Sequence, residues 1–429
     1  MDMAGLLSVA AIVFAYGVVS RYLGRWAITA PMVFLLVGWI IGADGLSLVD
    51  IGFEQSGIRL LAEATLVVVL FADATRIDIA VLRSQFDMPG RLLGIGLPLT
   101  IVLGGVLAWL LVPGISVAEG FLIGAILAPT DAALGKAVVT NRLIPVRVRQ
   151  VLNVESGLND GIALPVVTAL VAVAAAGADL ETPGHWVQFA LREIGLGIFV
   201  GLAVGVIGGA VLRASWERKW ITGAARQLAT LAIAAVAFSA TEMIMGNGFI
   251  AAFVAGAGFR AASREMHDTA ADLTEDVGEL ATWMTFLFFG AGLVVPAVQA
   301  ATVGAVIYVL LSLTIIRMVP VALALWGTHC APATAIFLGW FGPRGLASIL
   351  FALLIVDDAD LIGESVILNT VSLAVLASVF LHGVTAMSGS DLYIRKTGGL
   401  AAETPEMEPM DEMPETRRGG LFGKPEQGR

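Results

Sequence analysis

The chain is built as a succession of apolar stretches that runs almost from its first residue to about residue 388. A hydrocarbon core about 30 Å thick needs roughly 20 apolar residues per helix, and a backbone in lipid must satisfy its own hydrogen bonds. Charged and turn residues delimit thirteen stretches: 4–20, 27–43, 58–74, 92–112, 116–139, 150–177, 187–212, 227–245, 247–260, 277–296, 299–325, 332–356 and 364–388. The sequence therefore predicts an all-α polytopic membrane protein with about 13 transmembrane helices.

Composition agrees with a lipid environment and argues against several classes of protein. Apolar residues make up 58% of the 429 residues and charged residues only 14%, and the mean hydropathy is +0.88. The first stretch has no small-residue cleavage site after it, so we expect a retained helix and not a signal peptide. Cys330 is the single cysteine, and the sequence has no phosphate-binding loop, nucleophile elbow or dinucleotide fingerprint. We therefore expect no enzyme, no cofactor and no nucleic-acid partner.

Basic residues alternate with acidic residues between the two ends of the stretches. Cytoplasmic loops of membrane proteins hold the excess of positive charge. The basic side receives Arg21, Arg25, Arg76, Arg83, Arg91, Arg142, Arg147, Arg149, Arg213, Arg218, Lys219, Arg226, Arg260, Arg264, Arg317, Arg395 and Lys396. Acids such as Asp44, Glu119 and Asp357 fall on the other side. With an odd number of spans, this predicts a prokaryotic inner-membrane protein with its N-terminus outside and its C-terminus in the cytoplasm.

The chain divides into a transmembrane domain, residues 1–390, and a short tail, residues 391–429. From about residue 398 the sequence is rich in Pro, Glu, Gly and Met, and such a segment cannot bury a core. We therefore expect the tail to be cytoplasmic and disordered.

Five ionisable residues are the strongest cases of charge inside a predicted span, where each charge costs about 2.5–3.5 kcal/mol on insertion scales. They are Asp73, Asp131, Glu155, Asp160 and Arg344. Charges retained inside a membrane usually mark an ion or proton pathway. These residues are therefore the first candidates for function.

The densest polar cluster is V-L-N-V-E-S-G-L-N-D-G-I-A-L-P, residues 151–165, in the sixth stretch. On a helix, Glu155 and Asn159 lie one turn apart, and so do Ser156 and Asp160. Ser156 and Asp160 can then supply two oxygen ligands to an alkali cation from one helix. A polar contact between helices is the alternative, but four polar groups within six residues exceed what packing requires.

Two proline-containing segments interrupt other stretches. In L-A-P-T-D-A-A-L-G-K, residues 127–136, Pro129 removes a backbone donor, and Thr130 and Asp131 are residue types that cap helix N-termini. The segment F-L-G-W-F-G-P-R-G-L-A-S, residues 337–348, interrupts the twelfth stretch in the same way. By the predicted topology the two stretches run in opposite directions, as inverted repeats of secondary transporters do. We predict two broken helices that expose carbonyls and helix ends at the membrane midplane, with a simple proline kink as the alternative.

Arg344 lies in the second of these segments and needs a buried anion, because arginine does not deprotonate. Glu155 is the nearest acid without an evident ligand role, and we predict that it forms an ion pair with Arg344. Extension of Arg344 to an interface is the alternative. Asp73 is the weakest candidate, because Arg76 indicates that the membrane interface is close.

With E-S-G-L-N-D-G, A-P-T-D and G-P-R-G, the chain resembles the NhaP-type branch of the cation:proton antiporter superfamily, which is related to the sodium/proton exchangers. The resemblance covers essentially all of the predicted spans. It implies a homodimer in which a core domain, with two crossing unwound helices, moves beside a dimerisation domain by elevator-like alternating access.

The resemblance also implies roles for individual residues. Asp160 would be the site that cation and proton share, and Asn159 would mark the electroneutral branch. Ser156, Thr130 and Asp131 match positions that ligate or orient the ion, so Asp160, Ser156 and Thr130 would hold the monovalent cation. Glu155 and Arg344 match a structural ion pair. Asp73 matches an acidic position, often glutamate, that joins the site in some members.

We expect a secondary antiporter that exchanges Na⁺, or Li⁺, for H⁺. A desolvated carboxylate has a raised pKa that a nearby cation lowers, so the two ions exclude each other. A K⁺/H⁺ antiporter on the same scaffold is the nearest alternative, because oxygen ligands accept either ion. The absence of a TVGYG-type filter argues against a channel, and the absence of an evident organic-substrate pocket argues against a solute symporter. The histidines, His185, His267, His329 and His382, are expected at span ends or in loops, away from the site.

Overall fold

The computed structural model describes residues 3–48, 56–76, 87–131, 134–175, 183–263, 266, 270–356, 361–398 and 404–407. Every regular element within these residues is helical, and they contain no strand. Each of the thirteen predicted stretches coincides with one helix or with consecutive helices, so the all-α class is confirmed. Seven helices in this part of the chain are long and apolar enough to cross a bilayer alone, and the total of about 13 spans stays a prediction.

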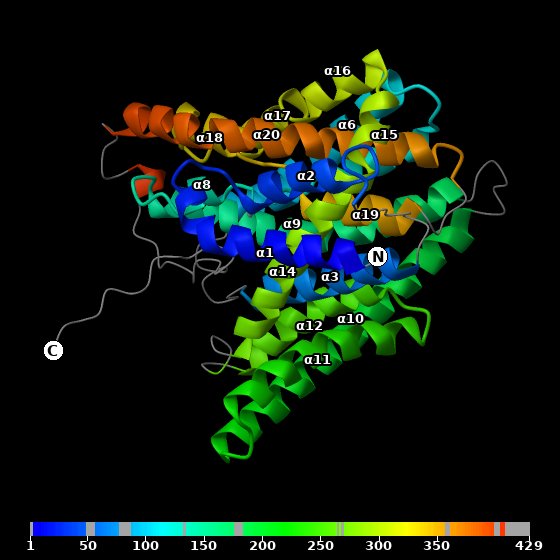
Figure 1. Cartoon of the computed structure of the whole chain (residues 1–429), viewed down its shortest axis with the longest axis vertical. Coiled ribbons are helices and arrows are strands. Elements are labelled where there is room, and N and C mark those ends of the chain that lie inside the picture. Colours follow the sequence, from blue (N-terminus) through cyan, green and yellow to red (C-terminus); the bar gives the residue numbers. More distant parts are fainter. Residues whose placement is uncertain are drawn as a thin grey trace.

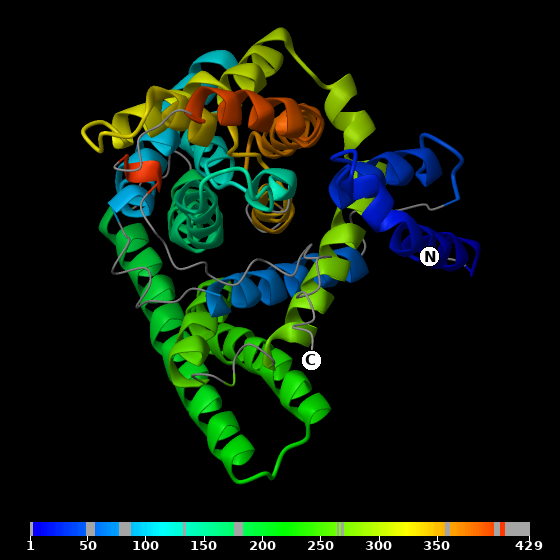
Figure 2. The same cartoon turned by 90° about the vertical axis from the view of Figure 1, so that its left-hand side faces the viewer.

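The helices form two groups, which Figure 1 shows from one side and Figure 2 after a quarter turn. The group at the top of Figure 2 contains both broken helices. It comprises η1 (Leu92–Gly96), α6 (Leu97–Leu111), α7 (Val117–Ile126), α8 (Lys136–Val139), α9 (Val146–Ala175), α16 (Val303–Ser312), α17 (Ile315–Ala324), α18 (Pro332–Trp340), α19 (Leu346–Val356) and α20 (Glu364–Thr397).

The second group lies below the first in Figure 2. It comprises α3 (Ser56–Thr75), α10 (Pro183–Glu217), α11 (Gly223–Glu242), α12 (Gly248–Ser263) and α14 (Asp272–Gly292), with α1 (Met3–Gly24) and α2 (Ala30–Ile41) beside α14. The short helix α5 (Asp87–Arg91) leads into η1, and α15 (Val294–Gln299) follows α14. Within the upper group, α9 and α19 are the helices that contact α3, and α9 also contacts α10 and α12.

Small residues allow α10 and α12 to pack with their backbones in close approach. A Cβ atom added at Gly201 would lie 2.8 Å from the Cα of Ala251, and one added at Gly205 would lie 2.7 Å from the Cα of Ala255. Small residues four positions apart on both helices are a common way to pack helices in lipid, where no hydrophobic effect drives association. This contact makes α10 and α12 a tightly joined pair.

The segment around Met245 separates two helices and does not form one broken span. Helix α11 ends at Glu242 and α12 begins at Gly248, and Met245 between them adopts a φ of 59°. The two helices then pack against each other, as a hairpin does. The predicted stretches 227–245 and 247–260 are therefore two separate helices.

The end of the chain departs from the sequence-based expectation at two points. Helix α20 continues to Thr397, past the predicted boundary of the transmembrane domain at residue 390. In the tail, most of which lies outside the described residues, Pro405–Met407 form a short 3-10 turn, η3, in which Glu406 is buried. This turn is ordered because Glu406 finds hydrogen-bond donors on α18.

Candidate cation site

Both predicted helix breaks are present. Residues 127–135 separate α7 from α8, and residues 341–345 separate α18 from α19. Pro129 and Pro343 lie in these breaks, where proline lacks the amide hydrogen that a continuous helix requires. The amide of Asp131 donates to the carbonyl oxygen of Pro343 at 2.8 Å. The breaks therefore touch, and the predicted pair of broken crossing helices is confirmed.

Arg344 binds the carbonyl end of the other broken helix. Its Nη1 donates to the carbonyl oxygens of Ala128 at 2.8 Å and of Pro129 at 3.2 Å, just after α7 ends. Its Nη2 donates to the carbonyl oxygen of Ser312 at 3.4 Å. The last carbonyls of a helix lack partners within the helix and carry partial negative charge. The fully buried Arg344 side chain supplies both the missing donors and a compensating positive charge.

Asp131 makes the reciprocal contact. Its Oδ2 accepts a hydrogen bond from the amide of Leu346 at 3.0 Å, at the N-terminus of α19. A carboxylate is stabilised there by the positive end of the helix dipole. Asp131 therefore neutralises the N-terminus of α19, the second half of the other broken helix. Gly345 makes the contact possible, because a Cβ atom there would overlap the Asp131 carboxylate.

The predicted ion pair between Glu155 and Arg344 is wrong, because Glu155 binds a different arginine. Glu155 Oε1 lies 2.5 Å from Nη2 of Arg317, on α17, and both side chains are 2% exposed. Gly342 leaves room for this guanidinium, since a Cβ atom there would lie 2.6 Å from Arg317 Nε. Arg344 has no need of a carboxylate, because backbone carbonyls accept its hydrogen bonds.

Helix α9 is tied to the first break through Asn159. Asn159 Nδ2 donates to Thr130 Oγ1 at 2.8 Å and lies 3.4 Å from the carbonyl oxygen of Thr130. Both residues are buried. On the neighbouring stripe of α9, the Ser156 hydroxyl donates to the carbonyl oxygen of Asn153 at 3.2 Å, so its oxygen lone pairs face outward from the helix backbone.

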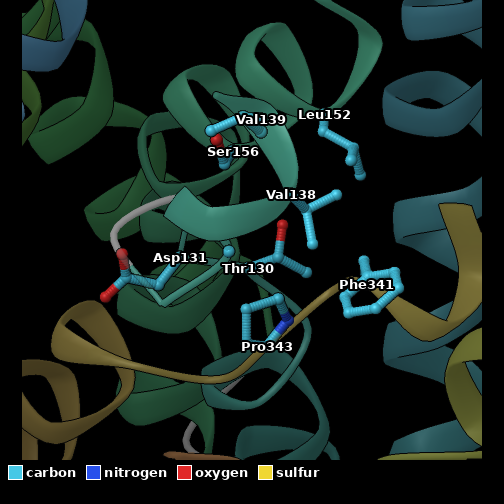
Figure 3. A pocket seen from close by; sticks show the side chains of 9 residues that line it. Thr130, Asp131, Val138, Val139, Leu152, Ser156, Phe341 and Pro343 are labelled. Carbon is cyan, nitrogen blue, oxygen red and sulfur yellow. The ribbon is translucent and has the colours of Figure 1, made fainter. Parts of the chain in front are cut away.

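A small cavity lies where the first break, the second break and α9 meet (Figure 3). It is lined by Thr130, Asp131, Gly135, Val138, Val139, Leu152, Ser156, Phe341 and Pro343. Its polar lining residues are Thr130, Ser156 and Asp131, and the Asp131 carboxylate points away from Phe341 in Figure 3. The other lining residues are apolar or glycine, so polar residues from two different elements meet at a cavity with a mainly apolar wall.

The structure separates the two remaining candidates. Asp160 is half-buried one helical turn after Ser156, on the same stripe of α9, although it does not itself line the described cavity. Asp73, near the end of α3, does not line the cavity either. Its Oδ1 lies 3.5 Å from Nη1 of Arg76, and Nη2 of Arg76 lies 2.7 Å from Oε2 of Glu275 on α14. Asp73 thus belongs to a charge network between α3 and α14.

Sequence reasoning missed several residues around the breaks. Arg317 was counted among the residues of the basic side, although it lies inside the predicted stretch 299–325 and the mainly apolar run 318–325 follows it. Ser348 donates to the carbonyl oxygen of Ile126 at 2.8 Å. Ser378 Oγ accepts from the amide of Arg344 at 2.7 Å and lies 3.1 Å from Nδ1 of His382.

His382 was expected at a span end or in a loop, but it is buried in the middle of α20. His329 lies in the loop before α18, as expected. His267 and the side chain of His185 lie outside the described residues.

The fold and the site define the chain as a polytopic membrane protein of the broken-helix type, in which two discontinuous helices cross beside a polar cavity. The family described as the transmembrane sodium/hydrogen exchanger matches residues 8–387. Because this match covers most of the sequence, the chain belongs to that family. The predicted resemblance to NhaP-type antiporters is thereby confirmed.

Individual relatives agree with this assignment. The K⁺/H⁺ antiporter NhaP of Alkalimonas amylolytica is 28% identical over 343 residues, which are 75% of this chain and 55% of that protein. An Na⁺/H⁺ antiporter of Saccharomyces cerevisiae is 26% identical over 270 residues, which are 58% of this chain and 27% of that protein. The chain thus spans about half, or less, of the length of these curated relatives.

The sodium proton antiporter MjNhaP1 of Methanocaldococcus jannaschii has the same fold. It superposes on this chain with a TM-score of 0.75 at 19% sequence identity, covering 93% of this chain and 99% of that chain.

Proposed function

We propose that this protein is a secondary antiporter that exchanges a monovalent cation for a proton, with Asp160 as the carboxylate for which both ions compete. The observation that carries the proposal is the cavity where the two helix breaks and α9 meet, which the polar residues Thr130, Asp131 and Ser156 line. Asp160 follows Ser156 by one helical turn and supplies the negative charge. Family membership and the antiporter names of the relatives support transport, and not catalysis, as the function.

The cation would be held by Asp160, Ser156 and Thr130, with Asn159 and Asp131 holding the break in place. A hard alkali cation prefers several oxygen ligands, and the Thr130 carbonyl has lone pairs beyond the one that faces Asn159. Proton binding neutralises the Asp160 carboxylate and removes its attraction for the cation, so each ion displaces the other. Asp73 is not required as a direct ligand in this arrangement, because Arg76 lies beside it.

Na⁺ and K⁺ are both candidates for the cation. The relatives in Alkalimonas amylolytica and Shewanella are named K⁺/H⁺ antiporters, whereas MjNhaP1 and the yeast relative are named for sodium. We propose Na⁺ as the cation that is exchanged for the proton, with K⁺ as the alternative.

The two groups of helices in Figure 2 support a separate role for each group. We assign α6–α9 and α16–α20 to a core that carries the ion, and α1–α3, α10–α12 and α14 to a dimerisation domain against which the core moves. The site would then alternate between the two faces of the membrane. The proposed orientation places the N-terminus outside and the C-terminus in the cytoplasm of a cell membrane, in agreement with the distribution of arginine and lysine.

Transport into proteoliposomes tests this function directly. Purified protein is reconstituted with a pH-sensitive dye inside acidic vesicles, and Na⁺, Li⁺ or K⁺ is added outside in turn. We expect the interior to become alkaline with at least one of these cations. Asp160→Asn is the matched variant, because the amide is similar in shape but cannot release a proton or balance a cation. Equal proton flux in this variant, or none with any cation in the parent protein, would rule the proposal out.

A further inference from the structure

The first halves of both broken helices begin at a buried glutamate. At α7, Ser116 Oγ accepts from the amide of Glu119 at 3.2 Å, and Glu119 Oε2 accepts from the amide of Ser116 at 2.6 Å. Glu119 Oε1 also accepts from the amide of Gly363 at 2.7 Å, just before α20. This capping box satisfies amides that have no partner within the helix. The glutamate belongs to the helix that it caps.

At α18 the corresponding glutamate comes from the tail. Glu406 Oε1 accepts from the amide of Ala331 at 2.5 Å and from the hydroxyl of Thr334 at 2.8 Å. Glu406 is 1% exposed although it lies in a segment rich in proline and charge. Burial of a carboxylate requires compensation, and here the N-terminus of α18 provides it through the Ala331 amide, the Thr334 hydroxyl and the helix dipole.

The same turn of the tail is attached to the helix that carries Asp160. Arg147, the second residue of α9, donates from Nη1 to the carbonyl oxygen of Pro405 at 2.9 Å. The described tail segment, residues 404–407, therefore bridges α9 and α18. Both helices reach the cavity: Ser156 on α9 lines it, and so does Phe341, which directly follows α18.

Contacts continue from Glu406 along α18 to the cavity wall. Thr334 Oγ1 lies 3.0 Å from the hydroxyl of Tyr393 on α20. The ring of Phe337 stacks on that of Tyr393 with centroids 4.2 Å apart, and it contacts the ring of Phe341 at 4.8 Å. Phe341 lines the cavity. Because α18 has only nine residues, a shift at its first turn reaches Phe341 through little intervening structure.

We propose that Glu406 is a positioning residue of the transport site, which the tail places on the N-terminus of α18 to hold this half-helix and its cavity-lining end in place. The cap of α7 is part of its own helix, whereas the cap of α18 comes from the tail, a separate segment of the chain. Docking of the tail therefore changes the affinity of the site for the cation through α18. The corresponding half-helix α7 needs no such contact, because Glu119 caps it from within the helix. The effect on transport rests on the proposed antiport, but the docking itself does not.

Cys330 provides a probe of docking that is independent of transport. It is the only cysteine in the sequence, is half-buried and precedes Ala331. Burial raises the pKa of its thiol, a hydrogen bond with Thr328 lowers it, and the charge of Glu406 raises it. Loss of the Glu406 carboxylate therefore lowers the pKa of this thiol, and the thiolate is the reactive form.

The experiment compares the full-length parent with Glu406→Ala and Glu406→Gln. We expect a maleimide to label Cys330 several-fold faster in Glu406→Ala, and the cation KM to rise with a smaller change in maximal rate. Glu406→Gln keeps an acceptor for Ala331 and Thr334 and should lie between the two. Two controls should label like the parent: Met407→Ala, in the same turn, and Glu119→Gln, which weakens the other cap.

A second variant keeps the test independent of folding defects in Glu406→Ala. A chain that ends at Gly398 should also label faster, and a synthetic peptide of residues 401–412 should slow labelling, whereas the same peptide carrying Glu406→Ala should not. Parent-like labelling and parent-like KM in all variants would overturn the proposal. Faster labelling with an unchanged KM would show that the tail docks but does not position the site. If no variant and no parent protein transports any cation, the labelling result still decides docking, and only the antiport proposal fails.

Discussion

Glu155 on α9 and Arg317 on α17 form a buried ion pair with an oxygen-to-nitrogen distance of 2.5 Å. The pair links the helix that carries Asp160 to the helix that precedes the second broken helix. Arg344, another buried arginine near the site, binds the carbonyl end of α7 instead. The two arginines thus bind different groups: Arg317 binds a carboxylate, and Arg344 binds the carbonyls at a helix end.

Removal of either member of the Glu155 pair should destabilise the protein. An uncompensated charge would remain buried, which costs about 3–5 kcal/mol. We expect Arg317→Ala and Glu155→Ala to lower the melting temperature in detergent, and the double variant to lose less than the sum. Glu63→Ala, which breaks the partly exposed pair of Arg59 and Glu63, is the control and should cost about 1 kcal/mol or less. A stronger coupling of Glu155 to Arg344 than to Arg317 would contradict the assignment.

A methyl group at residue 345 should disrupt the crossing of the broken helices. Because a Cβ atom there overlaps the Asp131 carboxylate, Gly345→Ala must displace the contact with the Leu346 amide. We expect a large loss of exchange in proteoliposomes with a lower melting temperature. Gly195→Ala on α10 is the matched control, since its Cβ atom would meet nothing within 4 Å. Parent-like exchange in Gly345→Ala would show that the position of Asp131 is unimportant.

Asn159 should be needed as a hydrogen-bond donor to Thr130. Its neutral amide, where a second acid could stand, also predicts electroneutral exchange. An ionised aspartate at 159 has no donor for the Thr130 carbonyl and adds a charge next to Asp160. We expect Asn159→Asp to weaken cation binding and lower stability, which a titration of KM and a melting curve measure.

In the parent protein, a potential imposed with valinomycin, with K⁺ excluded as a substrate, should leave the rate unchanged. A rate that follows the potential would refute electroneutrality.

Competition at one carboxylate should produce a bell-shaped pH dependence. At acidic pH protons displace the cation, whereas at alkaline pH the site is rarely protonated and proton turnover becomes limiting. Raising the cation concentration should therefore move the acidic limb to lower pH. His329→Gln, in the loop before α18, should leave the profile in place. His382 is unsuitable for this control, because it is buried beside Ser378, which accepts from the amide of Arg344. An acidic limb that stays fixed at every cation concentration would point to a separate pH sensor.

The sequence by itself determined the helices, the two breaks and the polar stripe of α9. These features depend on local chemistry: roughly 20 apolar residues span a bilayer, proline lacks an amide hydrogen, and residues four apart share a helix face. The breaks could therefore be predicted from Pro129 and Pro343, and the polar stripe from the cluster Glu155 to Asp160. The structure contains both breaks.

Only the tertiary structure decided which of these groups meet. Arg317 and Arg344 both lie in apolar surroundings, and either could neutralise Glu155 as far as sequence shows. The choice depends on how α9 crosses α17 and on the space that Gly342 leaves for a guanidinium. In the same way, Asp131 stabilises the end of α19, and Glu406 caps α18 from the tail. Such contacts join residues far apart in the chain, so they follow from the packing of whole helices, which no local pattern encodes.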